Sequence, residues 1–275
     1  MGCFEPVKQS EAMKRSAAAM NCPPATISEA DGVRYLHLGT PWVQGAMRIR
    51  KPLAIELEYV QRMMVWMLLR QGSDLGKGHA VQLGLGAGAI TRFCHSKLRM
   101  RCTAVELNAS VIGACRAWFH LPLDSPRLAV LEGDAASYVA DAAKAESAEV
   151  LCIDLYDHEA AAPVLDSATF YADCHRLLSE EGVLSVNLFG RQASFAHSAQ
   201  RIAAVFGEPQ VRCVQPTREG NSIVVAMKSG AFPTQTLLAA RAQNIETRFH
   251  LPARKWLRMI RPLPPVPPSP TDSAP

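Results

Sequence analysis

The sequence has no apolar run long enough to cross a bilayer, and its first twenty residues lack the apolar core of a signal peptide. That N-terminal segment instead carries charged side chains at Glu5, Lys8, Glu11, Lys14 and Arg15. We therefore expect a cytoplasmic protein with no membrane partner.

The sequence also lacks every cysteine pattern that would indicate a metal centre. Its eight cysteines are scattered, with no Cys-x-x-Cys and no Cys/His spacing of a zinc site. Several lie within apolar stretches, where a free cysteine behaves as a small hydrophobic residue. These features predict free thiols in a reducing compartment and no metal.

Strong charge of one sign is absent as well. The formal net charge is only +4, and the basic residues are spread along the chain rather than interleaved with aromatics. This distribution argues against a nucleic-acid partner. With 275 residues, 48% of them hydrophobic, the chain can bury one substantial core and a small additional subdomain.

What the sequence does contain is an alternating pattern between His79 and Asp157, where short β-branched runs alternate with segments of helical period. This alternation is typical of a Rossmann-like, doubly wound and mostly parallel sheet in an α/β protein. The predicted strands are His79–Leu83, Cys102–Val105, Leu128–Leu131 and Val150–Ile153, and the predicted helices are Ala89–Ser96, Ser110–Phe119 and Ala135–Ala143.

A glycine turn follows the first of these strands, with glycines at Gly84, Gly86 and Gly88. Glycines here let the backbone approach a ligand, and Glu106, at the end of the second strand about 20 residues later, is placed to accept hydrogen bonds from a ribose diol. The pair predicts a nucleoside site. Either a dinucleotide or a nucleoside with a sulfonium arm fits, and the glycines also have a purely structural interpretation as helix–strand packing devices.

Asp134 and Ala135 come directly after the third strand. A short acidic side chain there can accept a hydrogen bond from the exocyclic amine of adenine. Asp134 also suits a helix N-cap, and one residue can serve in both ways.

The fourth strand ends in Asp154-Leu155-Tyr156-Asp157, followed by His158. These carboxylates have a structural interpretation as turn formers. A metal held by Asp154, Asp157 and His158 is disfavoured because no further ligand is evident.

The remaining segments frame this central region. Turn residues Asp31-Gly32 and the flanking runs predict an N-terminal β-hairpin, and Leu53–Leu69 has apolar positions at helical spacing with a Met-rich face suited to core packing or a subunit contact. We expect an N-terminal segment (1–24), a β-hairpin unit (25–52), a nucleoside-binding catalytic domain (53–230), a helical segment (231–260) and a disordered Pro-rich tail (261–275).

Taken in order and spacing, these residues resemble the spermidine synthase family of polyamine aminopropyltransferases, from about Thr26 to Met227. The matching positions are Gln44, Gly84-Leu85-Gly86-Ala87-Gly88, Glu106, Ser125-Pro126-Arg127, Gly133-Asp134, Asp154-Leu155-Tyr156-Asp157 and Phe170-Tyr171.

The resemblance implies transfer of an aminopropyl group from decarboxylated S-adenosylmethionine to a diamine such as putrescine, giving spermidine and methylthioadenosine. It assigns Asp154 as the base, Asp157 as the anchor for the amine and Tyr156 as its hydrogen-bond partner. It also implies that Gln44, the turn glycines, Glu106, Asp134, Ala135 and Asp154 bind the co-substrate. It implies a dimer or tetramer as well, and of these we expect a homodimer.

Ala87 departs from the family, whose turn carries an Asp that contacts the ammonium of the aminopropyl arm. Two alternatives therefore stay open: a methyltransferase that uses ordinary S-adenosylmethionine, and a non-catalytic nucleoside-binding homologue.

Overall fold

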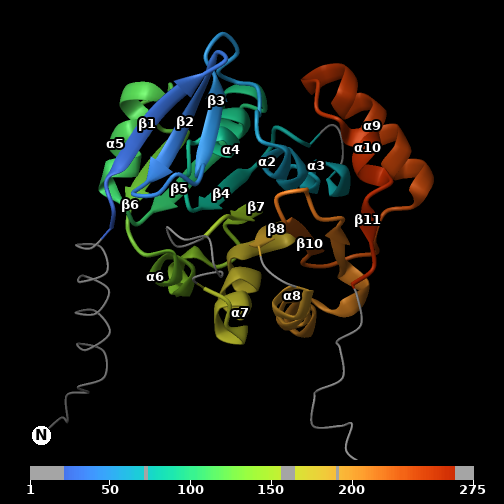
Figure 1. The fold of residues 1–275 in the computed structure, drawn as a ribbon. Helices are drawn as coiled ribbons and strands as arrows, with labels where there is room; N and C mark the ends of the chain where they lie inside the picture. The colour runs from blue at the N-terminus through green and yellow to red at the C-terminus, as the bar shows by residue number, and fades with distance from the viewer. Residues whose placement is uncertain (1–21, 71–73, 156–164, 190–191, 264–275) are drawn as a thin grey trace, which may run out of the picture.

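The structure is a computed structural model that describes residues 22–70, 74–155, 165–189 and 192–263. Over these residues the chain forms a three-stranded antiparallel sheet and an eight-stranded mixed sheet (Figure 1). The strands are β1 (Ala25–Ala30), β2 (Val33–Leu38), β3 (Gly45–Arg48), β4 (His79–Leu83), β5 (Arg101–Glu106), β6 (Leu128–Glu132), β7 (Ala148–Ile153), β8 (Leu178–Phe189), β9 (Val211–Val214), β10 (Asn221–Met227) and β11 (Ile260–Arg261). The α-helices are α2 (Glu58–Met63), α3 (Trp66–Leu69), α4 (Ala89–Arg92), α5 (Ala109–Trp118), α6 (Ala135–Ala140), α7 (Ala168–Leu177), α8 (Gln192–Phe206), α9 (Gln235–Phe249) and α10 (Ala253–Leu257).

The large sheet has the order β11-β9-β10-β8-β7-β4-β5-β6. Strands β8, β7, β4, β5 and β6 run parallel, whereas β10, β9 and β11 are antiparallel additions at one edge. The chain moves outward from β4 to β6 and then returns to β7, so the strand order reverses between β4 and β7. The predicted mostly parallel, doubly wound sheet is confirmed, and this reversal is where such sheets bind ligands.

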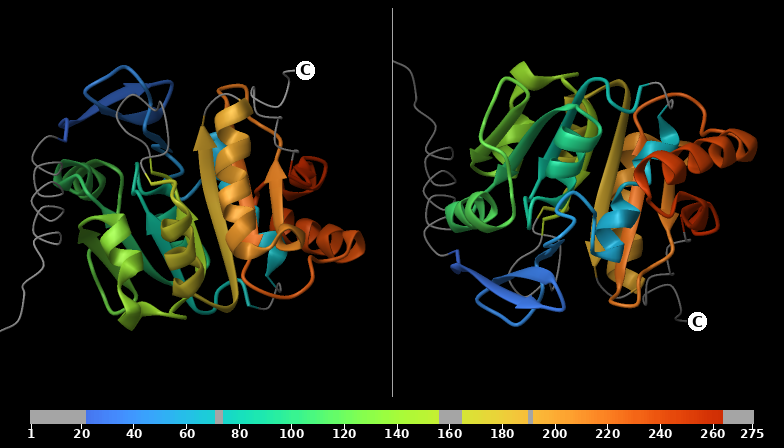
Figure 2. Two further views of the ribbon diagram at one scale, coloured as in Figure 1. Left: turned by 90° about the horizontal axis from the view of Figure 1, so that it is seen from below. Right: turned by 90° about the horizontal axis from the view of Figure 1, so that it is seen from above.

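Helices cover both faces of the sheet. Val81 and Leu83 of β4 pack with residues of α6, α7 and α8, whereas Ala80 packs into the core on the α2–α5, α9 and α10 side. Every residue of β4 is buried, as expected for a central parallel strand covered on both faces. The N-terminal sheet and helices α9 and α10 lie at opposite ends of the molecule (Figure 2).

The N-terminal unit contains a third strand in addition to the predicted hairpin. Strand β3 pairs antiparallel with β2 and begins at Gly45, just after Gln44. A Cβ on Gly45 would lie 2.5 Å from the Cβ of Ala87, a distance that real side chains do not reach. Gly45 is therefore required for this close approach, which seats the small sheet directly on the glycine turn of the large one.

The segment 53–69 differs from the predicted continuous helix. It contains the short helices α2 and α3, joined by a tighter turn in which the Met64 and Val65 amides bond three residues back. The Ser185 hydroxyl donates to the Met63 carbonyl (2.8 Å) at the end of α2. Residues 63–69 are buried on all sides, so no exposed face imposes a helical period; the Met-rich stretch is part of the core of this chain.

The C-terminal segment is also less regular than predicted. Helix α9 ends at His250, which adopts a left-handed conformation (φ 59°), and α10 follows. Strand β11 then pairs with Cys213 and Val214 of β9, so Arg261 belongs to the sheet rather than to the Pro-rich tail. Residues 264–275 lie outside the described residues. No helix in the described part of the chain is long and apolar enough to span a bilayer.

Candidate active site

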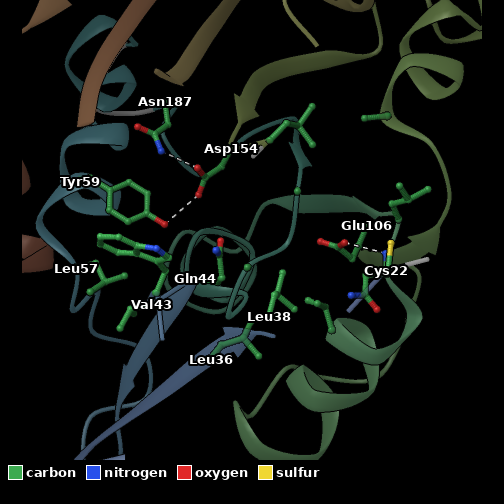
Figure 3. A pocket seen from close by; sticks show the side chains of 18 of the residues that line it. Cys22, Leu36, Leu38, Val43, Gln44, Leu57, Tyr59, Glu106, Asp154 and Asn187 are labelled. Atoms are coloured by element: carbon green, nitrogen blue, oxygen red, sulfur yellow. Dashed lines mark hydrogen bonds between the residues drawn. The ribbon is translucent and has the colours of Figure 1, made fainter. Parts of the chain in front are cut away.

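A cavity of about 750 Å³ lies between the N-terminal sheet and the carboxyl ends of β4, β5, β6 and β7 (Figure 3). Gly88 does not line it; it begins helix α4 instead. Tyr156 and Asp157 lie outside the described residues. The predicted site residues that do line it are Gln44, Gly84, Gly86, Glu106, Asp134, Ala135 and Asp154.

Gly84 brings the ends of β4 and β7 together. Its φ of +80° is a conformation that other residues adopt at a cost, and a Cβ there would lie 2.1 Å from the backbone oxygen of Asp154. The Asp154 amide in turn donates to the Leu83 carbonyl (2.9 Å). Only glycine at position 84 allows the turn to pass this close to the backbone of Asp154.

Buried side chains fix the glycine turn from behind. Gln82 Nε2 donates to the carbonyls of Gly84 (2.7 Å) and Leu85 (3.2 Å), the Cys115 thiol donates to Gly86 (3.0 Å), and the Arg92 guanidinium donates to Ala87. Burial lowers the pKa of Arg92 to about 10 and raises the pKa of Cys115 to about 12. The carbonyl oxygens of the turn are thus bonded within the protein.

Glu106 holds the same turn from the cavity side. Its carboxylate oxygens accept hydrogen bonds from the backbone amides of Leu85 (2.8 Å) and Asn108 (2.9 Å). Burial raises the pKa of Glu106; these backbone hydrogen bonds oppose the rise, and the nearby negative charge of Asp154 adds to it. Each oxygen keeps lone-pair capacity for a further donor, so the carboxylate can still bind a diol.

Asp134 does what its sequence context predicts for a helix cap. Its Oδ2 accepts from the Ser137 amide and the Ser137 hydroxyl, both at 2.8 Å, and so caps α6. Asp134 and Ala135, the first residue of α6, also line the cavity. The cap and a ligand contact are therefore compatible. Gln44 lies between Glu106 and Asp154 in the close-up view (Figure 3).

Asp154 is held by residues that the sequence did not single out. Its Oδ1 accepts from Asn187 Nδ2 (2.8 Å) and its Oδ2 accepts from the Tyr59 hydroxyl (3.2 Å), as Figure 3 shows. Burial raises the pKa of Asp154, and these two donors oppose the rise. The only signal for Asn187 in the sequence is an amide near the end of a strand whose second half is mostly apolar.

The charged side chains of the cavity lining are acidic, and one of them, Glu58, is ion-paired with Arg62 and Lys255. Among the cavity's described lining residues there is no Lys, Arg or His, although the whole chain has a net charge of +4. Such a site attracts cations and disfavours anions. The carboxylates that line it are Glu58, Glu106, Asp134, Asp154 and Glu219.

No group of three or more His, Cys, Asp or Glu side chains is arranged to hold a metal ion anywhere in the described ranges. None of the cysteines of those ranges forms a disulfide bond. The cavity lining therefore offers carboxylates, amides and the phenols of Tyr35 and Tyr59 among apolar side chains.

The fold and this cavity define a Rossmann-like transferase of the class I S-adenosylmethionine-dependent type. No protein-family model matches the sequence. The chain is, however, 31% identical to a polyamine aminopropyltransferase of Neisseria meningitidis over 241 residues, which cover 87% of this chain and 89% of that protein. This chain belongs to the polyamine aminopropyltransferase family, so the resemblance seen in the sequence is confirmed.

Solved structures show the same fold. A probable spermidine synthase from Corynebacterium glutamicum aligns over 85% of this chain and 90% of its own, with a TM-score of 0.68 and 20% identity. Human methyltransferase-like protein 13, in complex with SAH, aligns over 74% of this chain and 93% of its own, with a TM-score of 0.60 and 22% identity. The fold is thus shared by proteins named for different reactions, and the choice between reactions rests on the site.

Proposed function

We propose that this protein transfers an aminopropyl group from decarboxylated S-adenosylmethionine to a diamine such as putrescine, giving spermidine and methylthioadenosine. The observation that carries the proposal is the acidic cavity, which holds a buried, doubly hydrogen-bonded carboxylate at Asp154 and no basic side chain among its described lining. Both proposed substrates are cations, and the cavity suits them.

The chemistry is one in-line displacement. The amine nitrogen forms a bond to the methylene carbon next to the sulfonium, the carbon–sulfur bond breaks, and its electron pair stays on sulfur as a thioether. An alkylamine has a pKa of about 10.4, so a base must take its proton. Asp154 is that base in our proposal, and base assistance of this kind accelerates a reaction by roughly 10²–10⁴.

The co-substrate would use the remaining side of the cavity. Glu106 would bind the ribose diol, Asp134 the adenine amine, and Ala135, Gln44 and the turn glycines would contact the nucleoside. These roles rest on the resemblance together with the positions of these residues around the cavity, all except Gly88 lining it.

The same acidity bears on the choice of co-substrate. The side chain of Ala87 packs against Gly45 and does not line the large cavity. Its departure from the family removes one carboxylate while several others remain. Ordinary S-adenosylmethionine adds a carboxylate that would meet no basic partner among the described lining residues, so we propose the decarboxylated form.

From the resemblance we also propose that Asp157 anchors the amine, that Tyr156 hydrogen-bonds it and that the protein is a homodimer. From the cysteine usage and the charge distribution we propose that it is cytoplasmic and does not bind nucleic acid. Light scattering coupled to size-exclusion chromatography measures the oligomeric state directly.

The test is calorimetric titration with S-adenosylmethionine, its decarboxylated form and methylthioadenosine, followed by turnover with putrescine. We expect the decarboxylated form to bind tightest and spermidine to appear. Asp154→Asn should lower the turnover rate by roughly 10²–10⁴, whereas the matched surface variant Asp74→Asn, whose partner is Lys77, should leave it unchanged. Tighter binding of S-adenosylmethionine without polyamine formation would favour the methyltransferase; no nucleoside binding would favour the non-catalytic homologue.

A further inference from the structure

The two oxygens of Asp154 each accept a hydrogen bond from a different element. Asn187 is on β8 and Tyr59 is on α2, and the Asn187 side chain is almost fully buried (3% exposed). Both partners present donors to the carboxylate. This arrangement fits the ionised form of Asp154, which can only accept hydrogen bonds.

The direction of the Asn187 amide is itself set by a second residue. Asn187 Oδ1 accepts from Asn221 Nδ2 (3.2 Å) on the adjacent strand β10. Asn187 pairs with Ile223 in the antiparallel register, so Asn221 is its diagonal neighbour on the same face. The direction of the Asn221 amide is set in turn by Thr217, whose hydroxyl donates to Asn221 Oδ1 (3.5 Å) and whose backbone amide donates to the Asn221 carbonyl (2.8 Å).

We propose that Asn187 is a positioning residue, locked in orientation by Asn221, that holds Asp154 in place as an ionised carboxylate ready to accept a proton. This inference rests on the proposed function, because it assigns a role in preparing the base of that reaction.

The argument depends on the asymmetry of the amide group. If Asn187 rotated by 180°, its oxygen would face Asp154, and only a protonated carboxyl group could then donate to it. Asn221 opposes this rotation because its own amide would then face the Asn187 NH₂ group, donor against donor. Asn221 therefore favours the ionised form of Asp154 without touching it, through the orientation that it gives to Asn187.

The ionisable groups around Asp154 differ in their effect on its protonation. Tyr59 from α2 also donates, whereas the negative charge of Glu106 at the end of β5 would favour protonation; burial raises the pKa of the Cys152 thiol on β7, which keeps that thiol neutral. Glu58 and Glu219 line the same cavity, and Glu58 is ion-paired with Arg62 and Lys255. Burial also raises the pKa of Asp154, and the Asn187 and Tyr59 donors both oppose that rise.

Asn221→Asp tests the inference most directly. A carboxylate at position 221 would accept from the Asn187 NH₂ group and turn the Asn187 oxygen toward Asp154. We expect the acidic limb of the kcat/KM profile for putrescine to move to higher pH by on the order of one unit. Ser222→Asp is the matched control, because it adds the same charge one residue away on the opposite face of β10.

Asn187→Leu is the second variant, since it removes the donor at similar volume. We expect kcat to fall roughly tenfold and the acidic limb to rise, with the Kd for methylthioadenosine unchanged within about twofold. If this buried variant fails to fold, as judged by circular dichroism, the Asn221 and Ser222 variants decide the question.

The outcomes separate the two proposals. If the unaltered protein forms no polyamine, the proposed function fails. If it is active but Asn221→Asp leaves the acidic limb in place, or moves it no further than Ser222→Asp does, the positioning role of Asn187 is overturned while the proposed function stands.

Discussion

Glu106→Gln removes one charge from the site while keeping the shape of the side chain, and its effect can be worked out from the contacts of Glu106. The carboxylate accepts from the amides of Leu85 and Asn108 with different oxygens. A glutamine has only one oxygen, so its NH₂ group must face one of these N–H donors. The substitution therefore disturbs the glycine turn as well as the diol site.

The magnitude follows from two hydrogen-bond losses. A buried amide left facing a donor costs about 1–3 kcal/mol, and this should appear as a lower free energy of unfolding. In the complex, two charge-assisted bonds to the ribose diol would become neutral bonds, one of them reversed so that the glutamine NH₂ group donates, a loss of about 1.5–3 kcal/mol. We expect the Kd for methylthioadenosine to rise by roughly 10–100-fold.

Calorimetric titration measures that change, and Glu132→Gln is its matched control. Glu132 is the register partner of Glu106 on the neighbouring strand β6, is exposed, and does not line the cavity. Equal affinities for the Glu106→Gln variant and the unaltered protein would refute the assignment of Glu106 to the ribose.

Further variants test the rest of the site. Asp154→Asn should lower kcat by roughly 10²–10⁴. Burial raises the folded pKa of Asp154, so its ionised form lowers the free energy of unfolding above the folded pKa; this loss should fade as the pH falls through the folded pKa and be gone below the unfolded pKa of about 3.9, and denaturant titrations of the variant should lack this pH dependence. Gly84→Ala should lower the free energy of unfolding by about 1–3 kcal/mol and weaken nucleoside binding. Gly113→Ala is the control and should do neither, because no atom lies within 4 Å of a Cβ at that position. Equal melting temperatures for the two variants would contradict this prediction. Tyr59→Phe should lower kcat about tenfold and raise the acidic limb of the rate profile; an unchanged limb would mean that its hydroxyl does not act on Asp154.

Glu106, Asp154 and the turn glycines could be predicted from the sequence because each lies at or just after the end of a strand, which places it at the site. Glu106 ends the second parallel strand and Asp154 the fourth, and parallel strands bring their carboxyl ends to one edge of the sheet. The turn glycines follow from the same topology. These features could be predicted because strand ends are recognisable from local periodicity.

Tyr59 and Asn187 could not be identified in this way. Tyr59 meets Asp154 from 95 positions away, and Asn187 meets it from 33. Their contact depends on how α2 packs against β8 and β10, which no local pattern encodes. The break between α2 and α3 has a similar origin, because a stretch buried on all sides carries no periodic signal for where a helix ends.

The close approach of Gly45 to Ala87 ties the small N-terminal sheet to the nucleoside site. Because β3 rests on the glycine turn, a ligand that restrains this turn also restrains the strand above it. Deuterium uptake by the backbone amides of β2 and β3 should therefore slow when methylthioadenosine binds, including amides that do not face the cavity. By the same connection, loosening the small sheet should weaken nucleoside affinity without altering any residue on the carboxyl edge of the large sheet.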